Sequence, residues 1–115
     1  VHVVVCVSPD DYRRRYAAPD KAASAGPDTW DVPYWWVDAG AALMLLCLAA
    51  VDEGLAAGFL DVADRAGLRR LLGIPPDVAV VGLATLGHPS DAQRRSGSLA
   101  RGRRPLGEVV HREGW

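Results

Sequence analysis

The stretch Asp38-Ala-Gly-Ala-Ala-Leu-Met-Leu-Leu-Cys-Leu-Ala-Ala-Val51 decides the fold of this chain. From Ala39 to Val51 it holds no charged or strongly polar side chain, so a helix here has no face that suits water. A helix that is apolar all round is buried on all sides, in a protein core or in a membrane. This run of 13 residues is shorter than the roughly 20 that span a bilayer, so we expect a central core helix and no membrane segment.

Three other segments have the composition of strands. Residues Val1–Val7 and Val78–Leu86 are continuous apolar runs rich in β-branched residues, as in strands that are covered on both faces. Residues Leu55–Leu60 form a shorter extended piece. Together with the apolar helix, these segments predict one α+β domain in which a sheet packs around a central buried helix.

Two shorter helices are predicted from their start and stop signals. Ser8-Pro9-Asp10 supplies a cap and an acidic first turn to a basic helix over Asp11–Tyr16. An amphipathic helix over Val62–Leu72 is stopped by Gly73 and the prolines that follow it. Residues 17–31, after the first of these helices, have no apolar periodicity and predict a variable surface loop or lid. Loops of that length are often functional.

Composition and missing motifs exclude several functions. The formal net charge of -1 provides no global field to attract nucleic acid or an acidic membrane. The chain has neither a phosphate-binding glycine-rich loop of standard spacing nor a serine nucleophile elbow. Its histidines are far apart, and neither Cys6 nor Cys47 stands at a metal-ligand spacing to any of them. Both cysteines lie in apolar segments, which favours reduced, buried thiols, so we expect a cytoplasmic protein without a metal.

Residues 88–104 form an arginine-rich loop, and no acidic residue occurs between Ala92 and Gly107. Its arginines are Arg94, Arg95, Arg101, Arg103 and Arg104. The glycines and serines between them would let backbone amides join an anion-binding site. The same composition also suits a solvated basic loop, so the residues alone leave both interpretations open.

Four short segments, each with a fixed pattern of apolar, glycine, proline or basic residues, follow one another along the chain. They are Trp36-Val37-Asp38-Ala39-Gly40 leading to Ala49-Ala50-Val51-Asp52-Glu53-Gly54-Leu55, then Leu72-Gly73-Ile74-Pro75, then Leu86-Gly87-His88-Pro89, and last Arg101-Gly102-Arg103-Arg104-Pro105-Leu106-Gly107-Glu108-Val109-Val110. This order resembles the C-terminal half of the nitroreductase family. The resemblance extends to Val1–Val7 and the helix that follows it.

The resemblance implies an α+β homodimer that binds FMN at the subunit interface. Such proteins pass a hydride from NAD(P)H through flavin N5 to a small aromatic or conjugated acceptor. By position, Phe59, Leu60 and Asp61 would lie along the edge of the flavin ring, with a backbone N–H donated toward N5. Many relatives have Gly or Glu in place of Asp61, so the resemblance assigns the contact with N5 to the backbone amide at this position and gives the side chain no defined role. Arg101 and Arg103 match two basic positions that approach the FMN phosphate, and guanidinium groups bind phosphate in a bidentate way.

The family's Arg-Arg-Ser-x-Arg pattern near the N-terminus has no counterpart here, so the sequence predicts an incomplete nitroreductase-like domain over residues 1–115. The alternatives are a flavoenzyme, a catalytically incomplete partner subunit, and a structural fragment that needs another chain to form the flavin site. We expect the isolated chain to be inactive and to leave apolar surface exposed, because it has few elements to cover its apolar helix. Trp30, Tyr34, Trp35 and Trp36 suit either stacking on a flat substrate or packing at the entrance to that helix.

Overall fold

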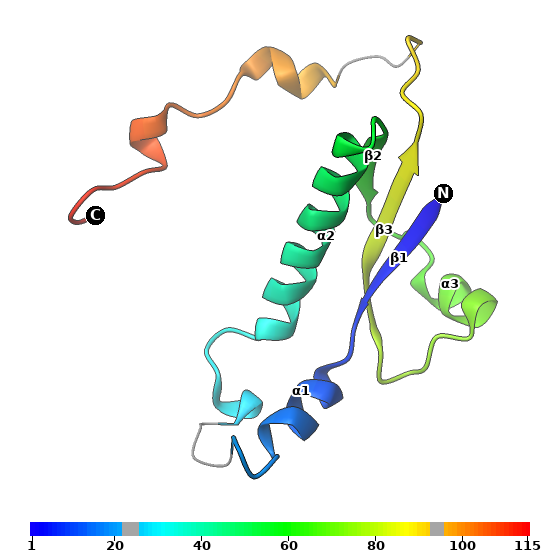
Figure 1. Ribbon diagram of the computed structural model, residues 1–115, viewed down its shortest axis with the longest axis vertical. Coiled ribbons are helices and arrows are strands. Elements are labelled where there is room, and N and C mark those ends of the chain that lie inside the picture. The colour runs from blue at the N-terminus through cyan, green and yellow to red at the C-terminus, as the bar shows by residue number, and fades with distance from the viewer. Residues whose placement is uncertain (22–25, 93–95) are drawn as a thin grey trace.

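One sheet of three antiparallel strands forms the centre of the structure, a computed structural model that describes residues 1–21, 26–92 and 96–115. The strands are β1 (His2–Val7), β2 (Ala56–Leu60) and β3 (Ala79–Gly87), in the order β1-β3-β2. The longest helix lies along one face of the sheet, and a short helix lies on the other side of β3 (Figure 1). The predicted α+β class is therefore confirmed.

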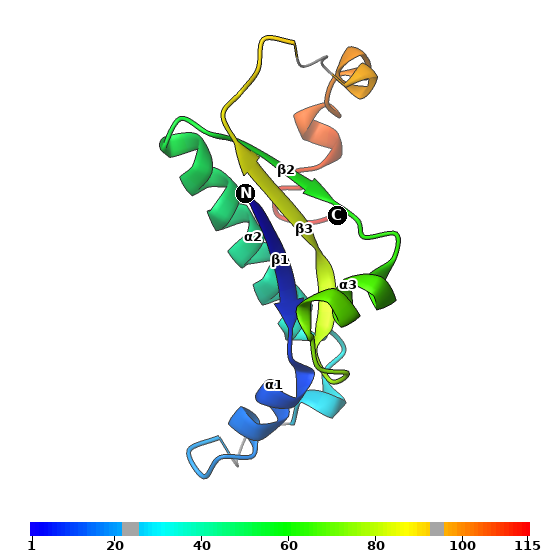
Figure 2. The same cartoon turned by 90° about the vertical axis from the view of Figure 1, so that its right-hand side faces the viewer.

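Three α-helices and three short 3-10 turns complete the described chain. The helices are α1 (Pro9–Tyr16), α2 (Tyr34–Asp52) and α3 (Arg65–Leu72), and the turns are η1 (Pro27–Thr29), η2 (Gly97–Arg101) and η3 (Leu106–Glu108). Figure 2 shows α2 along the sheet and α1 at the lower end of β1. The predicted loop over residues 17–31 thus contains η1.

The starts of α1 and α3 are set by local capping. The Ser8 hydroxyl accepts a hydrogen bond from the backbone N–H of Asp11, and Pro9 begins α1. Helix α3 begins at Arg65, three residues later than predicted, because the Asp64 carboxylate accepts the Gly67 N–H at 2.7 Å and so serves as the N-cap. Gly73 ends α3 in the left-handed conformation with φ of 64°, which a residue without a side chain adopts at little cost.

Strand β3 supplies more residues to the small buried core than any other described element. Its residues Val80, Gly82 and Ala84 are buried, and the residues between them are half-buried. Strand β1 is less well covered, because His2 and Cys6 are exposed, so the prediction that both strands are covered on both faces is wrong for β1. The reason is its place at the edge of a three-stranded antiparallel sheet, which tolerates an open face.

The prediction that the apolar helix is buried on all sides is wrong for this chain. Helix α2 packs on the sheet through one stripe with a spacing of three or four residues. That stripe consists of Ala39, Leu43, Leu46, Cys47 and Ala50, of which Ala39 and Ala50 are buried and the others half-buried. The opposite face is open to solvent: Met44 is 59 % exposed, Leu45 68 %, Leu48 58 % and Val51 64 %. The expectation that this chain leaves apolar surface exposed is therefore confirmed.

Helix α2 also runs further than its apolar core. It begins at Tyr34, so the adjacent aromatic residues form its first turn instead of preceding it. Among the described helices, α2 is long and apolar enough to cross a membrane, a test that the core helices of soluble proteins also pass.

The two cysteines are free thiols, but their predicted burial is wrong: Cys6 is exposed and Cys47 is half-buried. Cys6 stands where the pairing of β1 with β3 shifts between Val5 and Cys6, which interrupts the regular ladder at the sheet edge. No group of three or more His, Cys, Asp or Glu side chains is arranged to hold a metal ion in the described parts of the chain.

The last 20 residues form an extended C-terminal arm, residues 96–115, that leaves the sheet after β3. Every residue of this arm is exposed. In Figure 1 the arm, coloured orange to red, reaches away from α2 and the sheet. The arm therefore has no packing partner of substance within its own chain.

Candidate functional site

A hollow lies where β2 begins and β3 ends. Its volume is about 280 Å³, and we call it the β2–β3 hollow; it is lined by Ala56, Ala57, Gly58, Thr85, Leu86, Gly87 and His88. The antiparallel register places Ala56 opposite Gly87 and Gly58 opposite Thr85. A side chain at Gly58 would come within 3.2 Å of the Thr85 hydroxyl oxygen. Small residues on both strands therefore make this end of the sheet concave.

The predicted flavin-edge residues Phe59, Leu60 and Asp61 continue β2 beyond the hollow. The Phe59 ring packs directly over Gly82, because an added Cβ at Gly82 would lie 2.4 Å from the ring atom Cζ. Phe59 and Leu60 still expose about half of their surface, 46 % and 53 %. Because β2 is an edge strand, its outer backbone is open to a partner beyond the sheet.

The side chain of Asp61 is engaged within the chain. Its carboxylate accepts the backbone N–H of Val62 at 2.8 Å and forms an ion pair with Arg65. The Val62 N–H, followed by Arg65, holds the pKa of Asp61 below its usual range. The carboxylate thus stays ionised and anchors the start of α3. Only the backbone of Asp61 is then left to contact a bound cofactor.

The two predicted phosphate-binding arginines lie together on the C-terminal arm. Arg101 and Arg103 line a concave surface of about 610 Å³ with Ser98, Leu99 and Gly102. Gly102 stands between them with φ of 71° and ψ of -173°, a conformation with positive φ that glycine adopts without strain. Within the described residues, neither arginine has a carboxylate partner, and their guanidinium groups are available to an external anion.

Arg104 is bound to the arm itself. Its guanidinium donates to the Glu108 carboxylate at 3.4 Å and to the Glu108 carbonyl oxygen at 2.8 Å. The neighbouring arginines of the same loop therefore differ in availability. Arg94 and Arg95, which the sequence places in the same basic run, lie outside the described residues.

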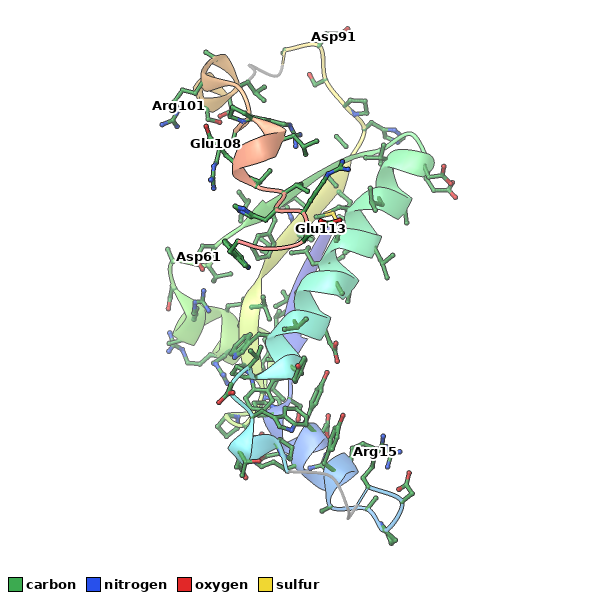
Figure 3. The ribbon with its side chains drawn as sticks, turned by 90° about the vertical axis from the view of Figure 1, so that its left-hand side faces the viewer. Arg15, Asp61, Asp91, Arg101, Glu108 and Glu113 are labelled. Atoms are coloured by element: carbon green, nitrogen blue, oxygen red, sulfur yellow. The ribbon has the colours of Figure 1, made fainter. Side chains whose placement is uncertain are left out.

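The predicted site residues fall in two separate parts of the molecule. Arg101 lies on the arm and Asp61 at the far end of β2 (Figure 3). The exposed arm does not bring its arginines against Phe59, Leu60 or Asp61 within this chain.

The aromatic residues before α2 form a cluster with α1. Trp30 makes edge-to-face contacts with Tyr16 at 4.7 Å and with Tyr34 at 5.3 Å between ring centroids. Tyr12 contacts Trp35 in the same way at 6.0 Å. These contacts favour the packing interpretation for Trp30, Tyr34 and Trp35, while Trp36 is exposed and takes no part in the cluster's described ring contacts.

A hydrogen bond fastens this cluster to α2. The Tyr12 hydroxyl donates to the Asp38 carboxylate. That hydrogen bond, together with burial, raises the pKa of Tyr12 to about 12, because the carboxylate stabilises the protonated phenol. The pair connects α1 with the first turns of α2, so it positions the aromatic cluster.

The β2–β3 hollow, with His88 at its rim, is the feature that sequence reasoning missed. The run of small residues Ala56-Ala57-Gly58 was visible in the sequence, but only the pairing with Gly87 and Thr85 shows that the small residues of two strands meet. The same pairing brings a histidine to a place that its position in sequence does not indicate.

The chain is similar to one protein family and to several solved structures. The model of the nitroreductase family matches residues 2–88. A nitroreductase family protein from Clostridium difficile is 18 % identical with a TM-score of 0.69, and this comparison covers 99 % of this chain and 59 % of that one. NfrA2 of B. megaterium is 27 % identical with a TM-score of 0.65, covering 99 % of this chain and 45 % of that one.

A third solved structure carries a more specific name. It is a putative NADH dehydrogenase/NAD(P)H nitroreductase from Parabacteroides distasonis, 21 % identical with a TM-score of 0.58, covering 99 % of this chain and 55 % of that one. The chain thus spans about half the length of these three solved structures. No curated protein matches it.

Proposed function

The chain belongs to the nitroreductase family, and on that premise we propose that the protein is an FMN-dependent oxidoreductase. When bound, FMN would supply the redox chemistry, taking a hydride from NAD(P)H and passing it through N5 to a small aromatic or conjugated acceptor. The protein would act as a soluble, cytoplasmic homodimer. Its own residues would bind and orient the cofactor and acceptor.

The observation that carries this proposal is the pair Arg101 and Arg103. Both are free of carboxylate partners in the described chain, and they flank Gly102 on one concave surface. Guanidinium groups bind phosphate oxygens in a bidentate way, and a glycine, which has no side chain, lets a phosphate approach the backbone closely. The donors present therefore fit the phosphate of FMN.

The edge of β2 fits the flat ring of the cofactor. Phe59 and Leu60 offer half-exposed apolar surface, and the outer edge of β2 has no strand partner in the sheet. The backbone of Asp61 remains usable because its side chain is held by Val62 and Arg65. The β2–β3 hollow gives access for a flat group at the start of the same edge.

A second subunit accounts for the distance between these two groups of residues. The molecule exposes 9137 Å², whereas a compact monomer of 12.3 kDa exposes about 6,100 Å². The excess, roughly 3,000 Å² per chain, is more than the area that one partner typically buries in an obligate interface, about 1,000 to 2,500 Å². Pairing of two chains would cover α2 and would let an arm from one chain complete the site of the other.

The alternative is a catalytically incomplete subunit or structural fragment that forms the flavin site with a different chain. The same excess area and the same separated residues support it. The two proposals differ in what the second chain is, and a titration separates them.

The test is titration of the purified protein with FMN, followed by flavin absorbance and by size. One FMN bound per chain in a particle of two identical chains supports the homodimeric flavoprotein. Binding that occurs only after a different chain is supplied supports the alternative. A folded protein that stays colourless in excess FMN under both conditions contradicts the assignment of FMN.

A further inference from the structure

Strand β3 extends beyond the end of β2, so part of its edge has no strand partner on that side. The last pair between the two strands is Leu60 with Leu83, whereas β3 begins at Ala79. Helix α3 lies beside this unpaired part of β3 (Figure 2). Backbone carbonyl groups that are shielded from water need other hydrogen-bond partners, and side chains of α3 supply them here.

Two arginines of α3, four residues apart, bind the carbonyl groups of this part of the chain. Arg65 donates to the Val80 carbonyl oxygen at 2.7 Å. Arg69 donates to the carbonyl oxygens of Val78 and Pro75, the latter at 2.6 Å. Residues four apart lie on the same face of a helix, so both guanidinium groups reach the same strand. The two arginines thus take the place of a neighbouring strand along the start of β3.

Arg65 differs from Arg69 because it also binds the chain at the end of β2. Its second guanidinium nitrogen pairs with the Asp61 carboxylate, and the same carboxylate oxygen accepts the Val62 N–H at 2.8 Å. A planar guanidinium presents its donors in a rigid fork, so one side chain fixes Asp61 relative to the Val80 carbonyl. Arg65 therefore bridges the end of β2 to β3 at the point where strand pairing stops.

We propose that Arg65 is a positioning residue for the flavin-edge residues 59–61, which it holds against β3 through the Asp61 carboxylate. This inference rests on the proposed function, which assigns these residues to the cofactor ring. Phe59 is already fixed by its packing over Gly82. Asp61 lies one residue beyond the last strand pair, so the bridge acts on the placement of its backbone.

The bridge differs from an ordinary surface ion pair in its third member. The side chains of Arg65 and Asp61 expose 47 % and 78 % of their surface, and exposed ion pairs by themselves contribute little to stability. The hydrogen bond from Arg65 to the Val80 carbonyl is partly buried, so it orients the guanidinium group toward Asp61. We therefore expect loss of Arg65 to change the placement of Asp61 more than the free energy of unfolding.

The experiment compares Arg65→Met with Arg69→Met, which removes hydrogen bonds to the same part of the chain without touching Asp61. Hydrogen exchange of the peptide that contains Asp61 and Val62 is measured in the FMN-free protein, and the FMN dissociation constant is measured by fluorescence quenching. Arg65→Met speeds that exchange at least about twofold and weakens FMN binding about two- to fivefold. Arg69→Met leaves the FMN dissociation constant of the folded protein unchanged.

Two further variants separate the bridge from general effects of charge. Arg65→Lys restores part of the FMN affinity, because its ammonium group pairs with Asp61 but lacks the rigid fork. Arg70→Met removes an exposed arginine of the same helix that forms no hydrogen bond or ion pair within the described residues, and it binds FMN like the wild type.

The outcomes distinguish this inference from the function on which it rests. A wild-type protein that takes up no FMN contradicts the proposed function, and this role of Arg65 with it. If the wild type binds FMN, unchanged exchange at Asp61 or an unchanged FMN dissociation constant in Arg65→Met overturns the inference alone. Equal weakening in Arg65→Met and Arg69→Met also overturns it, because the effect would then come from a loosened sheet edge.

Discussion

At the scale of single residues, the arginines of the basic loop differ: two have guanidinium groups that can bind an external anion, and one is already bound within the chain. Arg101 and Arg103 line a common concave surface, whereas Arg104 is bound to Glu108 through both its carboxylate and its carbonyl oxygen. Sequence alone shows three similar side chains. Their local partners predict unequal roles toward a phosphate.

Arg103→Ala is expected to weaken FMN binding about ten- to hundredfold, the range for loss of a hydrogen bond to a charged group. Arg104→Ala is the matched control, because its guanidinium is already engaged and its loss removes the same formal charge. The measurement is the FMN dissociation constant from fluorescence quenching. Equal weakening in both variants would mean that general basic charge, and not this surface, attracts the cofactor.

Tyr12 predicts a distinct step in an alkaline titration. Its pKa is raised to about 12 by the Asp38 carboxylate, so the protonated phenol is the form that stabilises the fold. This contribution is complete below the usual tyrosine pKa near 10 and is lost as the pH rises through about 12. Tyrosinate absorbance should therefore show one of the three tyrosines ionising late.

Tyr12→Phe should remove that late step and lower the free energy of unfolding at neutral pH by about 0.5–1 kcal/mol. Tyr34→Phe is the control, because Tyr34 contributes its ring to the cluster and has no hydroxyl hydrogen bond among the described contacts. Retention of the late step in Tyr12→Phe would show that another tyrosine carries it.

At the scale of elements, local sequence signals predicted which helices exist and where they end better than they predicted which of their faces are buried. Ser8 and Gly73 stand where the helices begin and end because capping acts over a few residues. The start of α3 was predicted three residues early, since apolar Val62 extended the pattern while the Asp64 cap decides the boundary. The stripe of α2 that faces the sheet could not be predicted, because a helix with uniform apolar composition carries no pattern that distinguishes one face.

The candidate site shows the same division. The sequence identified Arg101 and Arg103 through a short motif, and the structure shows both on one surface. It did not reveal the β2–β3 hollow, because that depends on pairing between strands more than 20 residues apart in sequence. Ion pairs such as the one between Asp61 and Arg65 also depend on where α3 starts.

Two glycines in different elements should respond oppositely to alanine. At Gly82 in β3, an added Cβ would lie 2.4 Å from Phe59 Cζ and 2.8 Å from the backbone oxygen of Leu60. The backbone atom has no rotamer by which to yield, so Gly82→Ala should cost about 1–3 kcal/mol of stability. At Gly40 in α2 nothing lies within 4 Å, and Gly40→Ala should stabilise by about 0.5–1 kcal/mol.

Chemical unfolding of the two variants checks this pair. Both changes add one methyl group. If they change the free energy of unfolding in opposite directions, the difference therefore reflects the space around each glycine. A Gly82→Ala variant as stable as the wild type would show that Phe59 does not lie over β3 in solution.

At the scale of the whole molecule, the chain is far from compact. Its radius of gyration is 18.5 Å, whereas a compact domain of this length has about 13 Å. The extended arm contributes to the larger radius, and the open face of α2 adds exposed apolar surface. Exposed apolar patches beyond a few hundred Å² mark interaction sites or aggregation-prone surfaces.

The open face of α2 should make the 115-residue chain associate. Leu45 and Leu48 lie near the middle of that face and expose 68 % and 58 % of their surface, so Leu45→Lys or Leu48→Glu should weaken association at least tenfold, as charges in the centre of an apolar interface do. Leu71→Lys is the matched control, because Leu71 is 80 % exposed but lies on α3. Sedimentation or light scattering over a range of concentrations provides the measurement.

A chain that stays monomeric throughout would show that the face of α2 is not an interface. If Leu71→Lys were as effective as Leu45→Lys, the association would be general aggregation, because a specific interface distinguishes one helix from the other.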